Sequence, residues 1–521
     1  MGNRHSFTRN IFLLIVISTI VRIIAACALN LGNDEVYYFT YALQPDWNHF
    51  DHPPLIGVFI RFFTFNLHWN TELTMRLTAI IGAAINTWLI AQCGRLVKNE
   101  HAGFIAALLY TASLYTSIIV GVFILPDSPQ VVFWLASLYI MLKTIKANNG
   151  NNLRLLWLGI FIGLATMCKV HGVFLWFGFG GYILFYQRKL LSNPYLYVAV
   201  LLTLCIVSPI VFWNVQNNFI TWRFHSERVE IKNSGINWDA FVTAVAGQFA
   251  YNNPLNIILY IIAGIAIVKR KFFMDRQQLR LLLWCGIPII VATTFISLFR
   301  DTLPHWSGPG FLSLMIVAGV FTEWQINDKH KKAYTTFLKI NTGLIAFVFV
   351  AGIIAIQFFP GTTAIKTIDP PQKKGDGDVT LDMYGWKEIK PVFDSIRKAD
   401  VAAHVMSADA PLIVNKWFPA GHLLFYAAYP LHVKMIGVGE LNDLHKFVWL
   451  NEMEGYLPQG ADGYFIVPSN YYTDPTTIYQ NDFENISLAA TIPQKRSGSV
   501  ARYWYIYRLK GAKKELGEKL W

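Results

Sequence analysis

Two adjacent acidic residues directly follow the first long apolar run of the sequence. Asp34 and Glu35 stand just before Tyr37 and Tyr38, and the apolar run ends near residue 29. A carboxylate held at the mouth of a helix can accept a proton from a hydroxyl group, as a general base does. The alternative is structural, because Asn33 or Asp34 would also serve as the cap of an interfacial helix. This motif alone leaves both interpretations open.

The same polar loop carries a second acid beside a histidine. Asp51 and His52 precede the pair Pro53-Pro54, whose rings fix the local backbone. The run at 55–67 is amphipathic and aromatic, so the alternative is an anchor in the headgroup layer. Because this acid shortly follows the first acid pair, the combination indicates a site with several polar groups.

Two further groups open later apolar runs. Asp127 lies between Pro126 and Pro129, where an acid and prolines also favour the start of a helix. Arg300 and His305 stand before Trp306 and could together hold a phosphate, although an Arg–Asp pair with an interfacial Trp is the structural alternative.

Lys169 and His171 lie between two other apolar runs and are weaker candidates. A lysine at the end of a span more often extends toward the polar surface than binds a ligand. Ionisable residues are costly inside or at the edge of a membrane, so each of these groups is a functional candidate.

The composition shows what must position these residues. The chain has 521 residues, of which 54% are hydrophobic and 15% charged, whereas soluble domains carry about 25% charged residues. This excludes soluble, disordered and fibrous proteins and predicts a polytopic α-helical membrane protein. The net charge of +12 indicates basic cytoplasmic loops and no nucleic-acid partner. The five cysteines have no metal-site spacing and are expected to be small core residues.

Apolar runs near the required length of about 20 residues predict about eleven spans, with twelve or thirteen as alternatives. The first run is expected to be a retained span, since no cleavage site follows it. Lys and Arg are about threefold more abundant in the connections that an inside N-terminus would place in the cytoplasm. All the candidate groups and the C-terminal third then lie outside. The expected spans are near 10–29, 74–94, 102–121, 128–146, 154–168, 172–187, 195–213, 252–268, 281–299, 306–322 and 337–358.

The sequence divides into three expected parts. Residues 1–358 form the transmembrane domain, with a first outer loop at about 31–73, and residues 359–378 form a polar linker. Residues 379–521 form a C-terminal α/β domain outside the membrane. Its signals are a helical stretch at 385–397 and strand-like runs at 404–406, 432–436, 464–467 and 503–507.

Carboxylates and cations gathered at one membrane face suit an anionic lipid headgroup and an acceptor hydroxyl. A transporter would more often place such groups near the midplane, on broken helices. Besides an enzyme that acts on such a lipid, two function classes stay open. One is a transporter or flippase of lipid-linked sugars, and the other is a cell-envelope assembly or sensor protein whose outer domain binds the ligand.

The motifs Asp34-Glu35-Val-Tyr-Tyr and Phe50-Asp-His-Pro-Pro-Leu55 resemble the first outer loop of GT-C glycosyltransferases. The group is the superfamily of dolichyl-phosphate-mannose protein mannosyltransferases and aminoarabinose (lipid A) transferases. Segments 125–130 and 300–306 look like further blocks of its bacterial members, as do 383–389 and 415–426 in the C-terminal third. In the aminoarabinose transferases Glu-Lys precedes the proline pair and the Lys contacts the donor phosphate. Asp51 and His52 occupy those positions here.

This resemblance implies an inverting glycosyltransferase that uses a polyprenyl-phosphate-linked sugar at the periplasmic face of the bacterial inner membrane. The acceptor would be lipid A or lipopolysaccharide, an envelope glycan, or a protein. The catalytic base carries over to Asp34, and the second acid of the family matches Asp127. No cofactor is certain, and a divalent metal between the acids is compatible with the sequence although no ligand spacing demands one. The remaining candidates are Glu35 and Asp51 near the acceptor or metal, His52, Lys169, Arg300 and His305 for the donor phosphate, and Tyr37, Tyr38 and Trp306 in the pocket.

Overall fold

The computed structural model describes residues 2–146, 152–229, 235–328, 330–360 and 371–518. The chain forms two units, which we call the membrane unit and the sheet unit. The membrane unit comprises Met1–Ala25, Trp47–Phe59 and Leu73–Phe349. The sheet unit comprises Ala26–Asp46, Ile60–Glu72 and Val350–Trp521. The segment around Asp34 thus belongs to the same unit as the C-terminal third.

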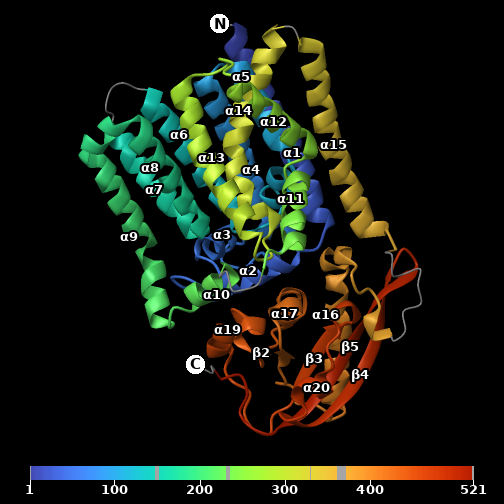
Figure 1. Cartoon of the computed structure of the whole chain (residues 1–521). Helices are drawn as coiled ribbons and strands as arrows, with labels where there is room; N and C mark the ends of the chain where they lie inside the picture. Colours follow the sequence, from blue (N-terminus) through green and yellow to red (C-terminus); the bar gives the residue numbers. More distant parts are fainter. Residues whose placement is uncertain (1, 147–151, 230–234, 329, 361–370, 519–521) are drawn as a thin grey trace. The chain divides into compact units, whose positions relative to one another are not determined.

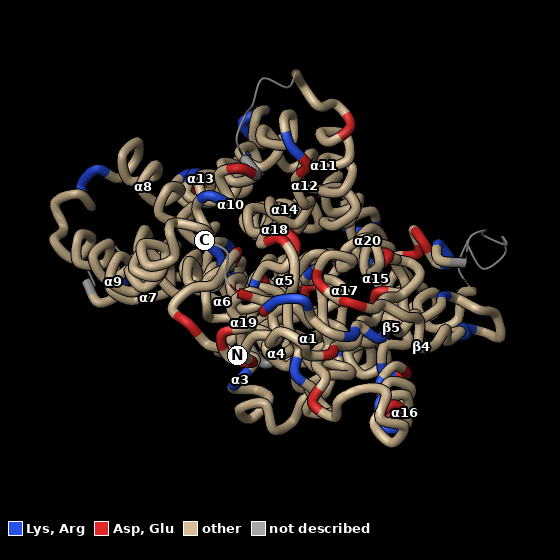
Figure 2. The backbone as a smooth tube through the Cα atoms, turned by 90° about the horizontal axis from the view of Figure 1, so that it is seen from below, with Lys and Arg blue, Asp and Glu red and all other residues tan. Residues whose placement is uncertain are grey.

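Long apolar helices build the membrane unit (Figure 1). Helix α14 packs against α5, α12 and α13, and most of its residues are buried because apolar residues occur on every side of the helix. Figure 2 shows a backbone in which uncharged residues predominate. Helix α9 contains no Lys, Arg, Asp or Glu, as expected of a membrane-spanning helix. The helices are α1 (Gly2–Ala28), α3 (Leu55–Phe63), α4 (Glu72–Val97), α5 (Glu100–Thr111), α6 (Asp127–Lys146), α7 (Asn152–Cys168), α8 (Phe174–Tyr186), α9 (Pro194–Gln216), α10 (Ile220–Val229), α11 (Trp238–Tyr251), α12 (Pro254–Val268), α13 (Arg276–Ile296), α14 (Gly308–Asp328) and α15 (Lys331–Phe358).

Seven helices among the described residues are long and apolar enough to cross a membrane. The count rises to eight if α11 and α12, bent by 97° at their junction, form one broken span. The chain is therefore a multi-pass membrane protein, but the expected count of about eleven is not confirmed. The difference arises where helices are short. The expected span at 102–121 is divided between α5 and the π-helix η1 (Tyr115–Ile119), and the apolar helices within 153–186 are two short ones.

A five-stranded mixed sheet with the order β2-β1-β3-β5-β4 organises the sheet unit. Strands β1 (Leu412–Val414), β2 (Met435–Gly437) and β3 (Gly463–Pro468) run parallel. Strands β4 (Phe483–Arg496) and β5 (Ser499–Ala512) form a long antiparallel hairpin that joins the sheet through β5 and β3. The parallel strands are buried along their whole length, as the apolar runs in their sequences require.

Helices complete the sheet unit. Helix α2 (Asn33–Leu43) packs against α17 (Trp417–Leu423), and their close approach uses Gly421, where a Cβ would lie 3.0 Å from the side chain of Val36. The other α-helices are α16 (Ile389–Ala402), α18 (Leu441–Leu444), α19 (Phe447–Glu454) and α20 (Pro475–Tyr479). The expected α/β character of the C-terminal third is confirmed.

The expected local elements of this third are confirmed in part. Strands β2, β3 and β5 overlap three of the four predicted runs, and α16 overlaps the predicted helix. The prediction at 404–406 was wrong, because these residues form the turn that follows α16, with His404 at a positive φ of 55°. Strands β1 and β4 were not predicted.

Candidate active site

The two acids of the first motif have different surroundings, although they are neighbours in sequence. Helix α2 begins at Asn33, and the side chain of Asp34 is exposed on its first turn. The side chain of Glu35 is buried and turns back, so that its Oε2 accepts a hydrogen bond of 2.7 Å from the backbone N–H of Gly32. Glu35 therefore satisfies an N–H at the start of the helix, which leaves Asp34 as the acid that faces outward.

The segment just before Asp34 is held by side chains from the C-terminal third. The hydroxyl of Tyr426 accepts a hydrogen bond of 2.7 Å from the N–H of Leu31 and donates one of 3.2 Å to Glu72. The Nε2 of His422 lies 2.9 Å from the carbonyl oxygens of Leu31 and Asp382. Since both partners are acceptors, this nitrogen carries the proton. The backbone segment that leads to Asp34 is thus held by side chains almost 400 positions away in sequence.

Asp382 adds a third contact to this segment. Its carboxylate accepts hydrogen bonds of 3.0 Å from the Nδ2 of Asn33 and 3.0 Å from the hydroxyl of Tyr471. Burial raises the pKa of Asp382, and these two hydrogen bonds partly offset that rise. Asn33, the residue adjacent to Asp34, is therefore joined to the C-terminal third by a side-chain hydrogen bond. We call His422, Tyr426 and Asp382 the clamp residues.

Tyr37 and Tyr38 are buried in the sheet unit, with 2% and 4% of their surfaces exposed. The ring of Tyr37 packs edge-on against Trp417 at 5.4 Å, and its hydroxyl accepts a hydrogen bond of 3.4 Å from the N–H of Lys446. In this arrangement the two tyrosines fasten α2 to its own unit. Their predicted place in a substrate pocket stays a prediction.

In the membrane unit, Asp127 is buried at the N-terminus of α6. Its Oδ2 lies 2.8 Å from the Nζ of Lys169, and its Oδ1 accepts a hydrogen bond of 3.2 Å from the hydroxyl of Tyr115. Gln130, one turn along α6, donates a hydrogen bond of 2.8 Å to the carbonyl of Lys169. Both charges are almost wholly buried, so each depends on the other for its compensation.

The loop before α3 brings Asp51 and His52 into the same unit as this ion pair. The carbonyl of Asp51 lies 2.7 Å from the Nε2 of His225 on α10. Burial lowers the pKa of His52 to about 3, an effect that Asp51 opposes and that Lys169 and His225 reinforce. His52 is accordingly a neutral imidazole near neutral pH, able to donate one N–H or to accept one hydrogen bond.

The remaining candidates lie between α13 and α14 and in the segment that follows α7. The ring of His305 stacks on Tyr251 at 6.4 Å, and that of Trp306 contacts His171 at 6.0 Å. His305 and His171 both interact electrostatically with Asp127. Arg300 is half-buried in the loop after α13, and its participation stays a prediction.

The structure thus gathers a polar cluster within the membrane unit, whose members are Asp51, His52, Asp127, Lys169, His171, His225 and His305. Asp34, Glu35, Tyr37 and Tyr38 belong to the sheet unit. Within the described part of the chain, no group of three or more His, Cys, Asp or Glu residues is placed to hold a metal ion.

Sequence reasoning missed several residues at these sites. His225 and Tyr115 lie in the membrane unit, and the clamp residues lie in the sheet unit. His422 and Tyr426 fall inside the block 415–426, and Asp382 precedes the block 383–389. A position inside or next to a motif block was therefore a sequence signal that could have identified the three clamp residues. For His225 we find none, since its contact with Asp51 joins residues 174 positions apart.

Comparison with known proteins agrees with this fold. Residues 51–213 match the model of the family described as dolichyl-phosphate-mannose-protein mannosyltransferase. The structure resembles the crystal structure of ArnT from Cupriavidus metallidurans in the apo state, with a TM-score of 0.58 and 15% identity over 96% of this chain and 98% of that chain. It resembles ArnT bound to undecaprenyl phosphate equally, with a TM-score of 0.58 and 16% identity over 95% and 97% of the two chains.

The chain has an ArnT-type fold. A curated relative, the lipid A galacturonosyltransferase RgtD of Rhizobium johnstonii, is 23% identical over 317 residues, which is 61% of this chain and 64% of the relative. The expected resemblance to bacterial ArnT-like GT-C glycosyltransferases is therefore confirmed. The family match includes Asp51, His52, Asp127 and Lys169, whereas Asp34 lies before its first residue.

Proposed function

We propose that the chain is an inverting glycosyltransferase that moves a sugar from a polyprenyl-phosphate donor to a hydroxyl group. The observation that carries this proposal is the division of roles between the two acids. Asp34 is exposed on a helix start that the clamp residues hold, while Glu35 is committed to that helix start. A fixed and outward-facing carboxylate is what a general base requires.

In the proposed reaction, Asp34 accepts the proton of the acceptor hydroxyl. The oxygen attacks the anomeric carbon from the face opposite the phosphate, so a new C–O bond forms as the bond to the phosphate oxygen breaks. The polyprenyl phosphate departs with the bonding electron pair, and the configuration at the anomeric carbon inverts. One displacement needs no covalent enzyme intermediate.

The leaving phosphate gains negative charge, which cations and N–H donors stabilise. The candidates for this role are those that the sequence indicates, namely the ammonium of Lys169, the imidazoles of His52 and His305, and Arg300. Lys169 already compensates Asp127 at 2.8 Å. A phosphate there would therefore share that ammonium with the carboxylate.

The relatives support a lipid-linked donor and a lipid acceptor. The ArnT structure binds undecaprenyl phosphate, and RgtD is named as a transferase that acts on lipid A. For this chain we propose lipid A or lipopolysaccharide as the acceptor class. We propose the periplasmic face of the bacterial inner membrane as the location. This is consistent with the excess of Lys and Arg in the connections that an inside N-terminus would place in the cytoplasm. The transporter alternative receives no support from these relatives.

The test is a transfer assay with the full chain in lipid vesicles. Polyprenyl-phosphate sugars and lipid A are added, and the products are analysed by mass spectrometry. We expect lipid A to gain the mass of one sugar residue with the parent and no such product with Asp34→Asn. Movement of the donor across the bilayer without any covalent product would instead establish the transporter.

A further inference from the structure

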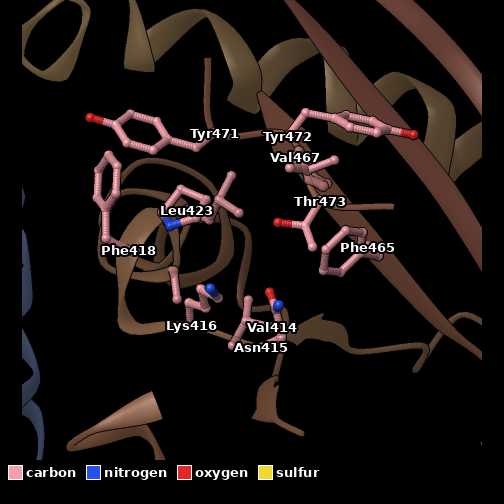
Figure 3. Close-up of a pocket in the computed structure, with 13 residues that line it drawn as sticks. Val414, Asn415, Lys416, Phe418, Leu423, Phe465, Val467, Tyr471, Tyr472 and Thr473 are labelled. Carbon is pink, nitrogen blue, oxygen red and sulfur yellow. The ribbon is translucent and has the colours of Figure 1, made fainter. Parts of the chain in front are cut away.

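The sheet unit contains a second candidate binding site, a pocket near strands β1 and β3. It encloses about 220 Å³, and its wall comes from the segment 414–423, from β3 and from the segment 471–473. Figure 3 shows the rings of Phe418 and Tyr471 at one side and Phe465 at the other. The pocket lies wholly within one unit, so its shape follows from the packing of that unit alone.

The pocket lies at the edge of the sheet where α/β proteins commonly bind ligands. Strands β1 and β3 are neighbours and run parallel, and the pocket wall includes the residues that directly follow β1 and nearly follow β3. In open α/β sheets, ligands bind in the crevice beyond the carboxyl ends of the strands. Asn415 and Lys416 come after β1, and Tyr471, Tyr472 and Thr473 come after β3.

The wall combines flat aromatic faces with a few polar ends. Phe418 and Tyr471 are perpendicular, with ring centroids 4.4 Å apart, and the hydroxyl of Tyr472 is fixed by a hydrogen bond of 2.8 Å with Tyr507. Figure 3 shows the polar ends of Asn415 and Thr473 directed into the space between the rings. A wall that combines apolar aromatic faces with directed polar groups is typical of a small-molecule site.

This chemistry matches a sugar ring. A pyranose has C–H faces that pack on aromatic rings and hydroxyl groups at its edge. The amide of Asn415 can both donate and accept hydrogen bonds, and so can the hydroxyl of Thr473. Lys416 lies 3.8 Å from Asp443, and both side chains are about half exposed. The wall thus offers a mixture of donors and acceptors beside apolar faces.

The same pocket is connected to the helix start that carries Asp34. Tyr471 contributes its ring to the wall, and its hydroxyl donates a hydrogen bond of 3.0 Å to Asp382. Asp382 in turn accepts a hydrogen bond of 3.0 Å from Asn33. A ligand that contacts the ring of Tyr471 is therefore two hydrogen bonds away from the residue adjacent to Asp34.

We propose that this pocket binds a pyranose unit of the acceptor glycan. The role of this glycan as the acceptor rests on the proposed transferase function. The bound ring packs between the aromatic side chains and forms hydrogen bonds with Asn415 and Thr473. In this way the pocket fixes a part of the acceptor remote from the hydroxyl that reacts.

The binding experiment uses the full chain in detergent and saturation-transfer NMR. The probes are methyl glycosides of a neutral hexose, an N-acetylhexosamine and a hexuronic acid. The test variant is Asn415→Ala with Thr473→Val, and the matched control is Asn485→Ala with Thr491→Val, which changes the same residue types at exposed positions of β4. We expect at least one glycoside to receive saturation from the parent and from the control. The test variant should bind it about tenfold more weakly, because two hydrogen bonds are lost.

A transfer assay on the same three proteins separates this proposal from the proposed function. If both hold, the test variant raises the KM for the acceptor about tenfold and leaves kcat nearly unchanged. Glycoside binding that depends on Asn415 and Thr473, without any transfer by the parent, would sustain the sugar pocket and defeat the transferase. Transfer with an unchanged KM in the test variant, or no glycoside binding that distinguishes it from the control, would overturn the pocket.

Discussion

At the scale of single residues, neighbouring acids acquire different roles from their surroundings. Asp34 is exposed, whereas Glu35 is 2% exposed and accepts the N–H of Gly32 at 2.7 Å. Sequence motifs present the two as one pair, and only the fold distinguishes them. This distinction gives the first prediction.

Asp34→Asn should lower the transfer rate by about 10²–10⁴-fold, because the variant keeps the shape of the side chain and loses the base. Binding of the polyprenyl-phosphate donor should be retained. The matched variant Glu35→Gln keeps an oxygen for the N–H of Gly32 and should retain more than about a tenth of the rate. Initial rates and donor binding measured on both variants decide the matter, and equal losses in the two would contradict the assignment.

The buried pair of Lys169 and Asp127 leads to the second prediction. Lys169→Met leaves a buried carboxylate without its cation, which costs about 3–5 kcal/mol. Asp127→Asn combined with Lys169→Met removes both charges and should recover much of that loss. Thermal unfolding in detergent measures each variant. A double variant no more stable than Lys169→Met would show that the pair does not compensate itself.

At the scale of elements, the structure explains why motif blocks of the C-terminal third accompany the motif at Asp34. The block 415–426 supplies His422 and Tyr426 to the segment before α2, and the N–H of Asn30 donates to the carbonyl of Met383 at 3.2 Å. These contacts fix the helix start from several directions. His422 and Tyr426 are therefore expected to matter for catalysis by positioning this helix start, without contacting the substrate.

Tyr426→Phe tests this expectation. The variant keeps the ring and loses the acceptor for the N–H of Leu31 and the donor to Glu72. We expect kcat to fall about 10- to 100-fold through misplacement of Asp34, while the KM for the donor changes little. Tyr456→Phe removes an exposed hydroxyl of the same unit and serves as the control. A parallel rise in KM with an unchanged kcat would indicate a substrate contact instead of positioning.

At the scale of the whole molecule, the sheet unit depends on a buried histidine that stays neutral. The ring of His422 stacks on Trp386 at 3.9 Å, and burial lowers its pKa to about 3. In the unfolded chain the pKa is about 6.5. Between these values the unfolded state binds a proton that the folded state does not. The free energy of unfolding must therefore fall as the pH falls through this window, by up to about 1.4 kcal/mol per pH unit.

We expect the unfolding temperature of the full chain to decline on acidification from pH 6.5 to pH 4. His422→Gln keeps an N–H donor and cannot titrate, so its decline should be shallower. His68→Gln alters an exposed histidine of the same unit and should follow the parent. Unfolding followed by intrinsic fluorescence at several pH values provides the measurement, and identical slopes for parent and His422→Gln would refute the argument.

The sequence by itself determined the membrane class, most helix positions, the α/β character of the C-terminal third and the residues worth considering as a site. These follow from composition, local periodicity and motif spacing, which are properties of short segments. Only the tertiary structure decided that Glu35 supports a helix start beside an exposed Asp34, that Lys169 pairs with Asp127, and that Asn33 is joined to Asp382. It also decided that residues 26–46 belong with the C-terminal sheet. The physical reason is that hydrogen bonds and burial join residues tens to hundreds of positions apart, and no local pattern records those pairings.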